Sequence, residues 1–162
     1  MSLEELLISY GYSKEDANKI IDNYSLTGYK EDTLKQKTIE IFDYMNNGLN
    51  YSREEVIKMT KTLPAIYSYS IENIKEKMDF YDSIDMHRLA VVDTKQLMQS
   101  VNLSYSKYMF FKDKHVNVSM DNYRLLFTGN KLFEKRYGIS KEELIEKYNY
   151  EEYKEKENGR TI

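Results

Sequence analysis

The chain has 162 residues and a net charge of −3, since 24 lysine and arginine side chains stand against 27 aspartate and glutamate side chains. Its length fits one domain, and 41% hydrophobic residues suffice for a core without covalent cross-links. The absence of cysteine excludes disulfides, thiolate nucleophiles and cysteine-ligated metals, and the two histidines, His87 and His115, are too far apart in sequence for a histidine-rich metal site. We therefore expect no cofactor.

The spacing of apolar residues predicts helices along almost the whole chain. Ala17, Ile20, Ile21 and Tyr24, for example, follow the i, i+3, i+4, i+7 pattern of one helix face. No comparable alternating run, typical of a strand, occurs. The predicted helices are 2–9, 13–24, 31–46, 52–63, 70–84, 87–101, 104–114, 119–127, 130–137 and 140–157. The sequence therefore predicts an all-α fold.

Four helix starts carry a serine followed three residues later by an acidic residue. Such a serine accepts a backbone amide of the first turn, while the acid favours the positive end of the helix. Gly11 and Gly138 each precede one of these serines by two residues, as expected for the end of the preceding helix. The four pairs are Ser2 with Glu5, Ser13 with Asp16, Ser52 with Glu55 and Ser140 with Glu143.

The sequence also contains an internal repeat. Segment 11–20 matches 50–59, segment 29–37 matches 69–77, and a third, weaker copy covers 85–114. The two matches are offset by 39 and 40 residues. Two helices per copy at a period of about 40 residues are typical of a helical solenoid, in which each copy buries its apolar face against the next. We predict a right- or left-handed solenoid of about three repeats in a single domain, 1–150. The repeats are 11–47, 50–84 and 85–114, followed by a helical cap at 115–150 and a charged tail, 151–162, that frays.

The best-preserved copy resembles the repeats of the mitochondrial transcription termination factor (mTERF) family. The resemblance rests on YSREEVIKM at 51–59 and LPAIYSYSIENI at 63–74, and GYSKED at 11–16 matches the same pattern less well. The leucine–proline mark is met once, at Pro64, since Ser25 and Met98 stand near the corresponding places of the other copies. The resemblance implies a curved solenoid with a 3₁₀-like turn in each repeat, whose concave basic face holds nucleic acid in organellar members. With about three repeats and no transit peptide, the chain looks like a short prokaryotic relative.

Basic residues are concentrated in segment 85–138, which has 9 basic and 5 acidic side chains. Basic side chains neutralise phosphates, and the tyrosines and phenylalanines interleaved with them can stack on unpaired bases. Alternatively, these aromatic residues pack the core. We expect weak, salt-sensitive binding of DNA or RNA through 105–137, as in a protein of transcription or RNA metabolism. The predicted binding residues are Lys107, Lys112, Lys114, Arg124, Lys131, Lys135 and Arg136.

The alternative function is a protein-interaction module. An acidic, tyrosine-rich solenoid surface suits a protein partner, because tyrosine is enriched at interface hot spots. Tyr67, Tyr69 and Tyr81 are the candidate contacts, unless they fill the packing between repeats. Both functions are non-enzymatic. We expect no enzyme, since the chain has no glycine-rich phosphate loop and no catalytic motif with a serine or histidine nucleophile or base.

The sequence lacks the features of membrane and exported proteins. Apolar runs such as Leu89-Ala90-Val91-Val92 are far shorter than the roughly 20 residues that cross a bilayer. The first residues, MSLEE, have neither the basic and apolar regions of a signal peptide nor the composition of a transit peptide. We therefore expect a cytoplasmic location without membrane contact.

Overall fold

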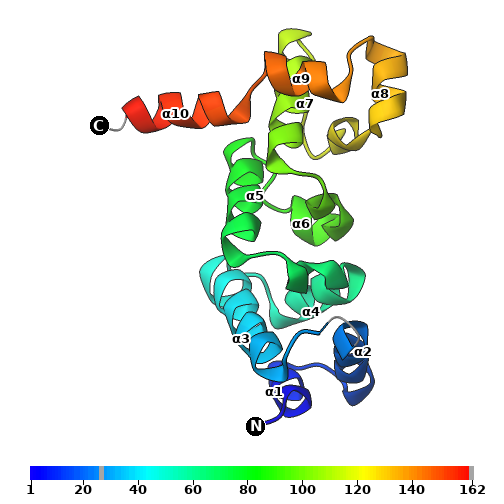
Figure 1. The fold of residues 1–162 in the computed structure, drawn as a ribbon, viewed down its shortest axis with the longest axis vertical. Coiled ribbons are helices and arrows are strands. Elements are labelled where there is room, and N and C mark those ends of the chain that lie inside the picture. The colour runs from blue at the N-terminus through cyan, green and yellow to red at the C-terminus, as the bar shows by residue number, and fades with distance from the viewer. Residues whose placement is uncertain (26–27, 161–162) are drawn as a thin grey trace. The chain divides into compact units, whose positions relative to one another are not determined.

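The computed structural model describes residues 1–25 and 28–160, which are helical and contain no strand (Figure 1). The predicted all-α fold is thus confirmed for this part of the chain. Residues 26 and 27 of the first predicted repeat and residues 161 and 162 of the predicted tail lie outside it. The structure divides into two compact units, which are described in turn. Unit 1 comprises residues 1–75 and 90–95, and unit 2 comprises residues 76–89 and those from 96 onward.

Unit 1 is built from the N-terminal helices. They are α1 (Leu3–Tyr10), α2 (Lys14–Ser25), α3 (Glu31–Phe42) with the π-helical turn η1 (Asp43–Gly48), α4 (Arg53–Thr62) and the 3₁₀ turn η2 (Pro64–Ser68). Large side chains that fill its core include Leu7, Met45, Met59 and Tyr67. Helix α5 (Ile71–Ser83), the short α6 (Leu89–Val92) and the 3₁₀ turn η3 (Thr94–Met98) contribute residues to both units.

Unit 2 is organised around α7 (Val101–Asp113). After it come the 3₁₀ turn η4 (Tyr123–Phe127), α8 (Asn130–Tyr137), α9 (Lys141–Lys147) and α10 (Tyr150–Arg160). The core of this unit is aromatic, because the rings of Phe110 and Phe111 lie 5.4 and 5.7 Å from the buried ring of Phe133. Edge-to-face contacts of this kind add to the stabilisation that burial provides.

The four predicted helix starts are confirmed by hydrogen bonds. The hydroxyl oxygens of Ser2, Ser13, Ser52 and Ser140 each accept the backbone amide three residues later, at 3.0 to 3.1 Å. At Ser52 and Ser140 the acidic side chain also accepts the serine's own amide, which completes a capping box. The predicted helix ends at Gly11 and Gly138 have positive φ, 117° and 70°, where glycine is favoured.

Three predicted helices differ from the structure. The segment 87–101 is split into α6 and η3, and α7 begins at Val101 because Ser100 caps it through the amide of Leu103. Within 119–127 only the 3₁₀ turn η4 forms. The segment 140–157 breaks into α9 and α10, since Asn149 accepts the amide of Glu152 and starts a new helix.

The tail that the sequence predicts to fray is helical through α10. Tyr150 is buried, and the ring of Tyr153 stacks 4.9 Å from the ring of Tyr105 in α7. Lys154 adds an ion pair of 3.4 Å to Glu76. These side chains, spaced three and four residues apart, place one face of α10 on the rest of unit 2.

A 3₁₀ turn followed by a helix occurs three times, as η2 with α5, η3 with α7 and η4 with α8. In addition, the seventh residue of α3, of α5 and of α7 is a lysine. The ammonium of each lysine donates a hydrogen bond to a backbone carbonyl in or directly after the next 3₁₀ turn of the chain. The pairs are Lys37 with Tyr69, Lys77 with Leu97 and Lys107 with Thr128. We call these three residues the turn-binding lysines. Each ties a helix to a segment that follows it by 20 to 32 residues.

Candidate nucleic-acid interface

Six of the seven predicted nucleic-acid-binding residues are exposed in unit 2. They come from three places: the C-terminal end of α7, the turn η4, and α8. Within the described residues, 1–25 and 28–160, none of the six forms an ion pair with a carboxylate. We call them the exposed basic set: Lys112, Lys114, Arg124, Lys131, Lys135 and Arg136.

Helix α8 carries half of the exposed basic set. Its Phe133 is 1% exposed and points into the aromatic core, which fixes the rotation of the helix about its axis. At 3.6 residues per turn, Lys131 and Lys135 then lie on the side opposite Phe133, with their ammonium groups in solvent. Lys135 and Arg136 lie in the last turn, where a positive charge also stabilises the helix through its dipole.

Lys107 does not belong to this set, which corrects the sequence-based prediction. The side chain is 1% exposed, and its ammonium donates to the carbonyl of Thr128 at 2.8 Å and to the amide oxygen of Gln99 at 3.1 Å. The ring of Phe133 lies 5.3 Å from the same nitrogen. Burial, with a smaller contribution from Lys141, lowers the pKa of Lys107 to about 8. A phosphate cannot reach an ammonium enclosed in this way.

The sequence did contain a signal for the burial of Lys107. Leu103 lies four residues before it and Phe110 and Phe111 three and four residues after it, so all four share one face of α7. This is the apolar face that packs on α8 through the phenylalanine rings. A lysine in the middle of such a stripe is more consistent with a buried hydrogen-bonding role than with a surface charge.

Three of the aromatic residues interleaved with the basic ones belong to the core. Phe110, Phe111 and Phe133 are buried, as the alternative interpretation of the sequence holds. Tyr108 and Tyr123 are half-buried and keep part of their rings at the surface. Tyr105, Phe127 and Tyr137 are half-buried as well.

Tyr108 lines a pocket of about 320 Å³ at the C-terminal end of α7. Lys112, His115 and the segment Val116–Val118 form the rest of its wall. The pocket thus combines an aromatic ring, two side chains that can carry positive charge, a primary amide and apolar valines. These chemical types meet there within the predicted binding segment, 105–137.

Two of the three tyrosines predicted to face a protein partner are in the core, which corrects that prediction. Tyr67 is 0% exposed and its hydroxyl accepts a hydrogen bond from Thr38, while Tyr81 is 2% exposed and shares a 3.1 Å hydrogen bond with Ser104. Burial raises the pKa of both hydroxyls, that of Tyr81 to about 12. Tyr69 is half-buried, and its carbonyl accepts Lys37.

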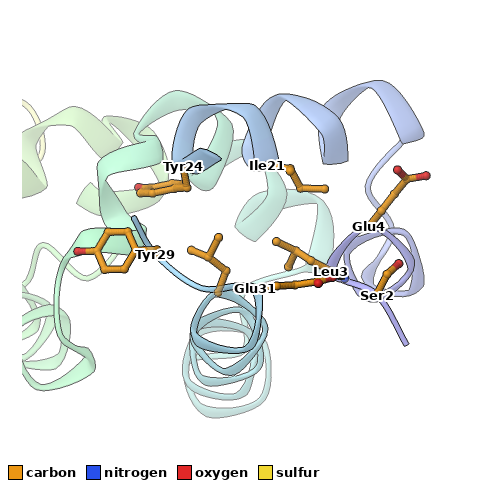
Figure 2. Close-up of a pocket in the computed structure, with 8 residues that line it drawn as sticks. Ser2, Leu3, Glu4, Ile21, Tyr24, Tyr29 and Glu31 are labelled. Atoms are coloured by element: carbon orange, nitrogen blue, oxygen red, sulfur yellow. Dashed lines mark hydrogen bonds between the residues drawn. The ribbon is translucent and has the colours of Figure 1, made fainter. Parts of the chain in front are cut away.

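A second pocket, of about 390 Å³, lies in unit 1 among the ends of α1, α2 and α3. Figure 2 shows Tyr24 and Tyr29 at one end of it and Ser2, Leu3 and Glu4 at the other. The carboxylate of Glu31 in its wall accepts the backbone amide of Leu3 at 2.7 Å. The two tyrosines flank residues 26 and 27, which lie outside the described part of the chain, so we assign no ligand to this pocket.

No protein-family model, curated protein or solved structure matches the chain in comparisons with known proteins. In the part of the chain that the structure describes, no group of three or more acidic, histidine or cysteine side chains could hold a metal ion. No described helix is long and apolar enough to cross a membrane.

Proposed function

We propose that the protein is a non-enzymatic nucleic-acid-binding protein and that the exposed basic set contacts the phosphates. The observation that carries this proposal is the combination of exposure and lack of ion pairing among six basic side chains between Lys112 and Arg136. A basic side chain that is not held by a carboxylate can bind a phosphate without first breaking an ion pair. The gain comes from the counterions that the nucleic acid releases.

The mTERF-like repeat arrangement is part of the same proposal. The recurrence of a 3₁₀ turn, a helix and a turn-binding lysine supports it, because each unit of such an arrangement needs a fixed contact to the next. The resemblance of residues 51–74 to that family supports nucleic acid as the partner. We favour nucleic acid over a protein partner because Tyr67 and Tyr81 are enclosed in the core.

The expected binding is weak and strongly dependent on salt. Each phosphate neutralised contributes about −0.7 to the slope of log affinity against log salt for a single strand, so six contacts give at most about −4. The net charge of −3 opposes association with a polyanion and keeps the affinity low at physiological salt.

Fluorescence anisotropy with labelled oligonucleotides at several salt concentrations tests the proposal. We expect the triple variant Lys131→Glu, Lys135→Glu, Arg136→Glu to bind less tightly at low salt and to flatten the salt slope by about 2, which is three phosphate contacts. The matched control is Lys14→Glu, Lys30→Glu, Lys58→Glu, which makes the same change in net charge at exposed positions of unit 1. Absence of binding by the wild-type chain at low salt, or equal losses in both triple variants, would refute the proposal.

A further inference from the structure

We propose that the pocket at the C-terminal end of α7 takes one unpaired nucleotide of a single-stranded nucleic acid, with the base against Tyr108 and the phosphate at Lys112 and His115. The inference rests on the proposed function and narrows it, because it commits the protein to single strands. It also names contacts outside α8, so variants of the pocket and variants of α8 test the pocket proposal and the proposed function independently.

The ring of Tyr108 is held in place for stacking. Its centroid lies 6.3 Å from that of the Phe80 ring, with the two planes almost perpendicular, and the residue lines the pocket. Edge-to-face contact restrains the ring without covering both of its faces. Val116 and the buried Val118 add apolar surface to the lining. A flat, largely apolar group with polar edges, such as a nucleobase, fits these surroundings.

The charged side of the pocket suits a phosphate. Lys112 lies four residues after Tyr108 and therefore on the same face of α7, and His115 follows just beyond the helix. An imidazole can donate a hydrogen bond to a phosphate oxygen whether or not it is protonated. The residues that line the pocket include Lys112 and no acidic side chain. The nearest acidic residue in sequence, Asp113, is not among them and accepts a 2.5 Å hydrogen bond from the hydroxyl of Tyr148. The pocket therefore presents net positive charge.

The rim of the pocket is ordered by local hydrogen bonds. His115 has a φ of 60°, and the amide of Val116 donates to the carbonyl of Phe111 at 2.9 Å, which closes the end of α7. The side chain of Asn122 donates to the carbonyl of Asn117 at 2.9 Å and accepts the amide of Ser119 at 2.7 Å. A loop fixed in this way loses little further freedom when a ligand binds, so more of the contact energy remains as affinity.

The size of the pocket selects an unpaired base. At about 320 Å³ it lies at the lower end of the range of ligand pockets, a size that suits a single nucleotide. The faces of a base within a duplex are covered by its neighbours, so a base can reach Tyr108 only after leaving the stack. A single strand offers such bases without the cost of unpairing.

Anisotropy with a labelled single strand and the duplex of the same sequence tests the proposal. We expect Tyr108→Leu and His115→Gly to weaken single-strand binding by about tenfold and severalfold, because a lost base–aromatic stack or phosphate contact has effects of this order. Glycine suits the left-handed backbone at position 115. Tyr108→Phe keeps the ring and should bind like the wild-type chain. Circular dichroism checks that each variant is folded.

A second measurement leaves the protein unchanged. The wild-type protein is tested with a single strand in which every base is replaced by an abasic sugar, which keeps all its phosphates. We expect the wild-type protein to bind this strand more weakly than the natural strand. The loss of affinity should be at least as large as the loss that Tyr108→Leu causes with the natural strand. If the abasic strand binds as well as the natural one, or if Tyr108→Leu and His115→Gly bind like the wild-type chain, the pocket proposal is wrong. When the α8 triple variant still loses affinity in that case, the proposed function stands without the pocket. When the wild-type chain binds neither nucleic acid at low salt, both proposals fall.

Discussion

Lys107 should make the stability of the chain rise with pH in the alkaline range. Burial lowers the pKa of this side chain from its ordinary 10.5 to about 8 in the folded state. Below pH 8 the ammonium is charged in both the folded and the unfolded chain. Between pH 8 and 10.5 the unfolded chain binds more protons than the folded one, and the free energy of unfolding therefore increases with pH.

The size of this effect follows from the two pKa values. Each pH unit inside the window adds at most about 1.4 kcal/mol, so a change from pH 7.5 to 9.5 should raise the free energy of unfolding by about 2 kcal/mol. Higher pH is unsuitable for the measurement, because the buried tyrosines act in the opposite direction. The pKa of Tyr81 and of Tyr150 is raised to about 12, so the unfolded chain loses those protons first, from about pH 10.

Urea unfolding followed by far-ultraviolet circular dichroism at several pH values measures the effect. The comparison is with Lys107→Met, which keeps the length of the side chain and removes the titrating group. Whatever the stability of this variant at pH 7.5, its increase toward pH 9.5 should be smaller than that of the wild-type chain by about 2 kcal/mol. Equal pH dependence of the two chains would refute the assignment of Lys107 as a buried cation.

Three further changes test the packing and the helix ends. Phe133→Ala should lower the free energy of unfolding by about 3 to 5 kcal/mol, because it opens a cavity in a closed aromatic core, and urea unfolding measures this. Ser52→Ala removes the serine of a capping box and should cost about 1 kcal/mol in the same assay, whereas the neighbouring Arg53→Ala should cost less. Gly11→Ala should lower the melting temperature, because φ there is 117° and the added methyl would lie 3.3 Å from Ile57; an unchanged melting temperature would contradict the left-handed cap.

The helix starts could be predicted because their determinants are local. A serine and an acid three residues apart satisfy the amides of one turn without help from the rest of the chain. The sequence does not predict the start at Ser100, because Leu103 stands where the acid is expected and half of the pattern is absent. The start at Asn149 does have an acid three residues later, at Glu152, but the helical periodicity continues across it and therefore predicts helix interior.

The candidate site was harder to predict, since exposure depends on tertiary packing. Lysines at Lys131 and Lys135 lie opposite the buried Phe133, and helical periodicity alone places them at the surface. Tyrosine gives no such indication, because its ring suits a core and its hydroxyl suits a surface. Tyr67 and Tyr81 can be buried because Thr38 and Ser104 form hydrogen bonds with their hydroxyls inside the protein. These two partners come from distant parts of the sequence.

The turn-binding lysines give the chain a direction. Each donates to a carbonyl that lies 20 to 32 residues nearer the C-terminus, so during translation the lysine is synthesised before the residue that accepts its hydrogen bond. A fragment that stops at the end of α7 would leave Lys107 without Thr128, and one that stops after η4 and Thr128 would retain the pair. A fragment that is to keep one of these pairs therefore ends after the acceptor at the 3₁₀ turn, and not after the helix that carries the lysine.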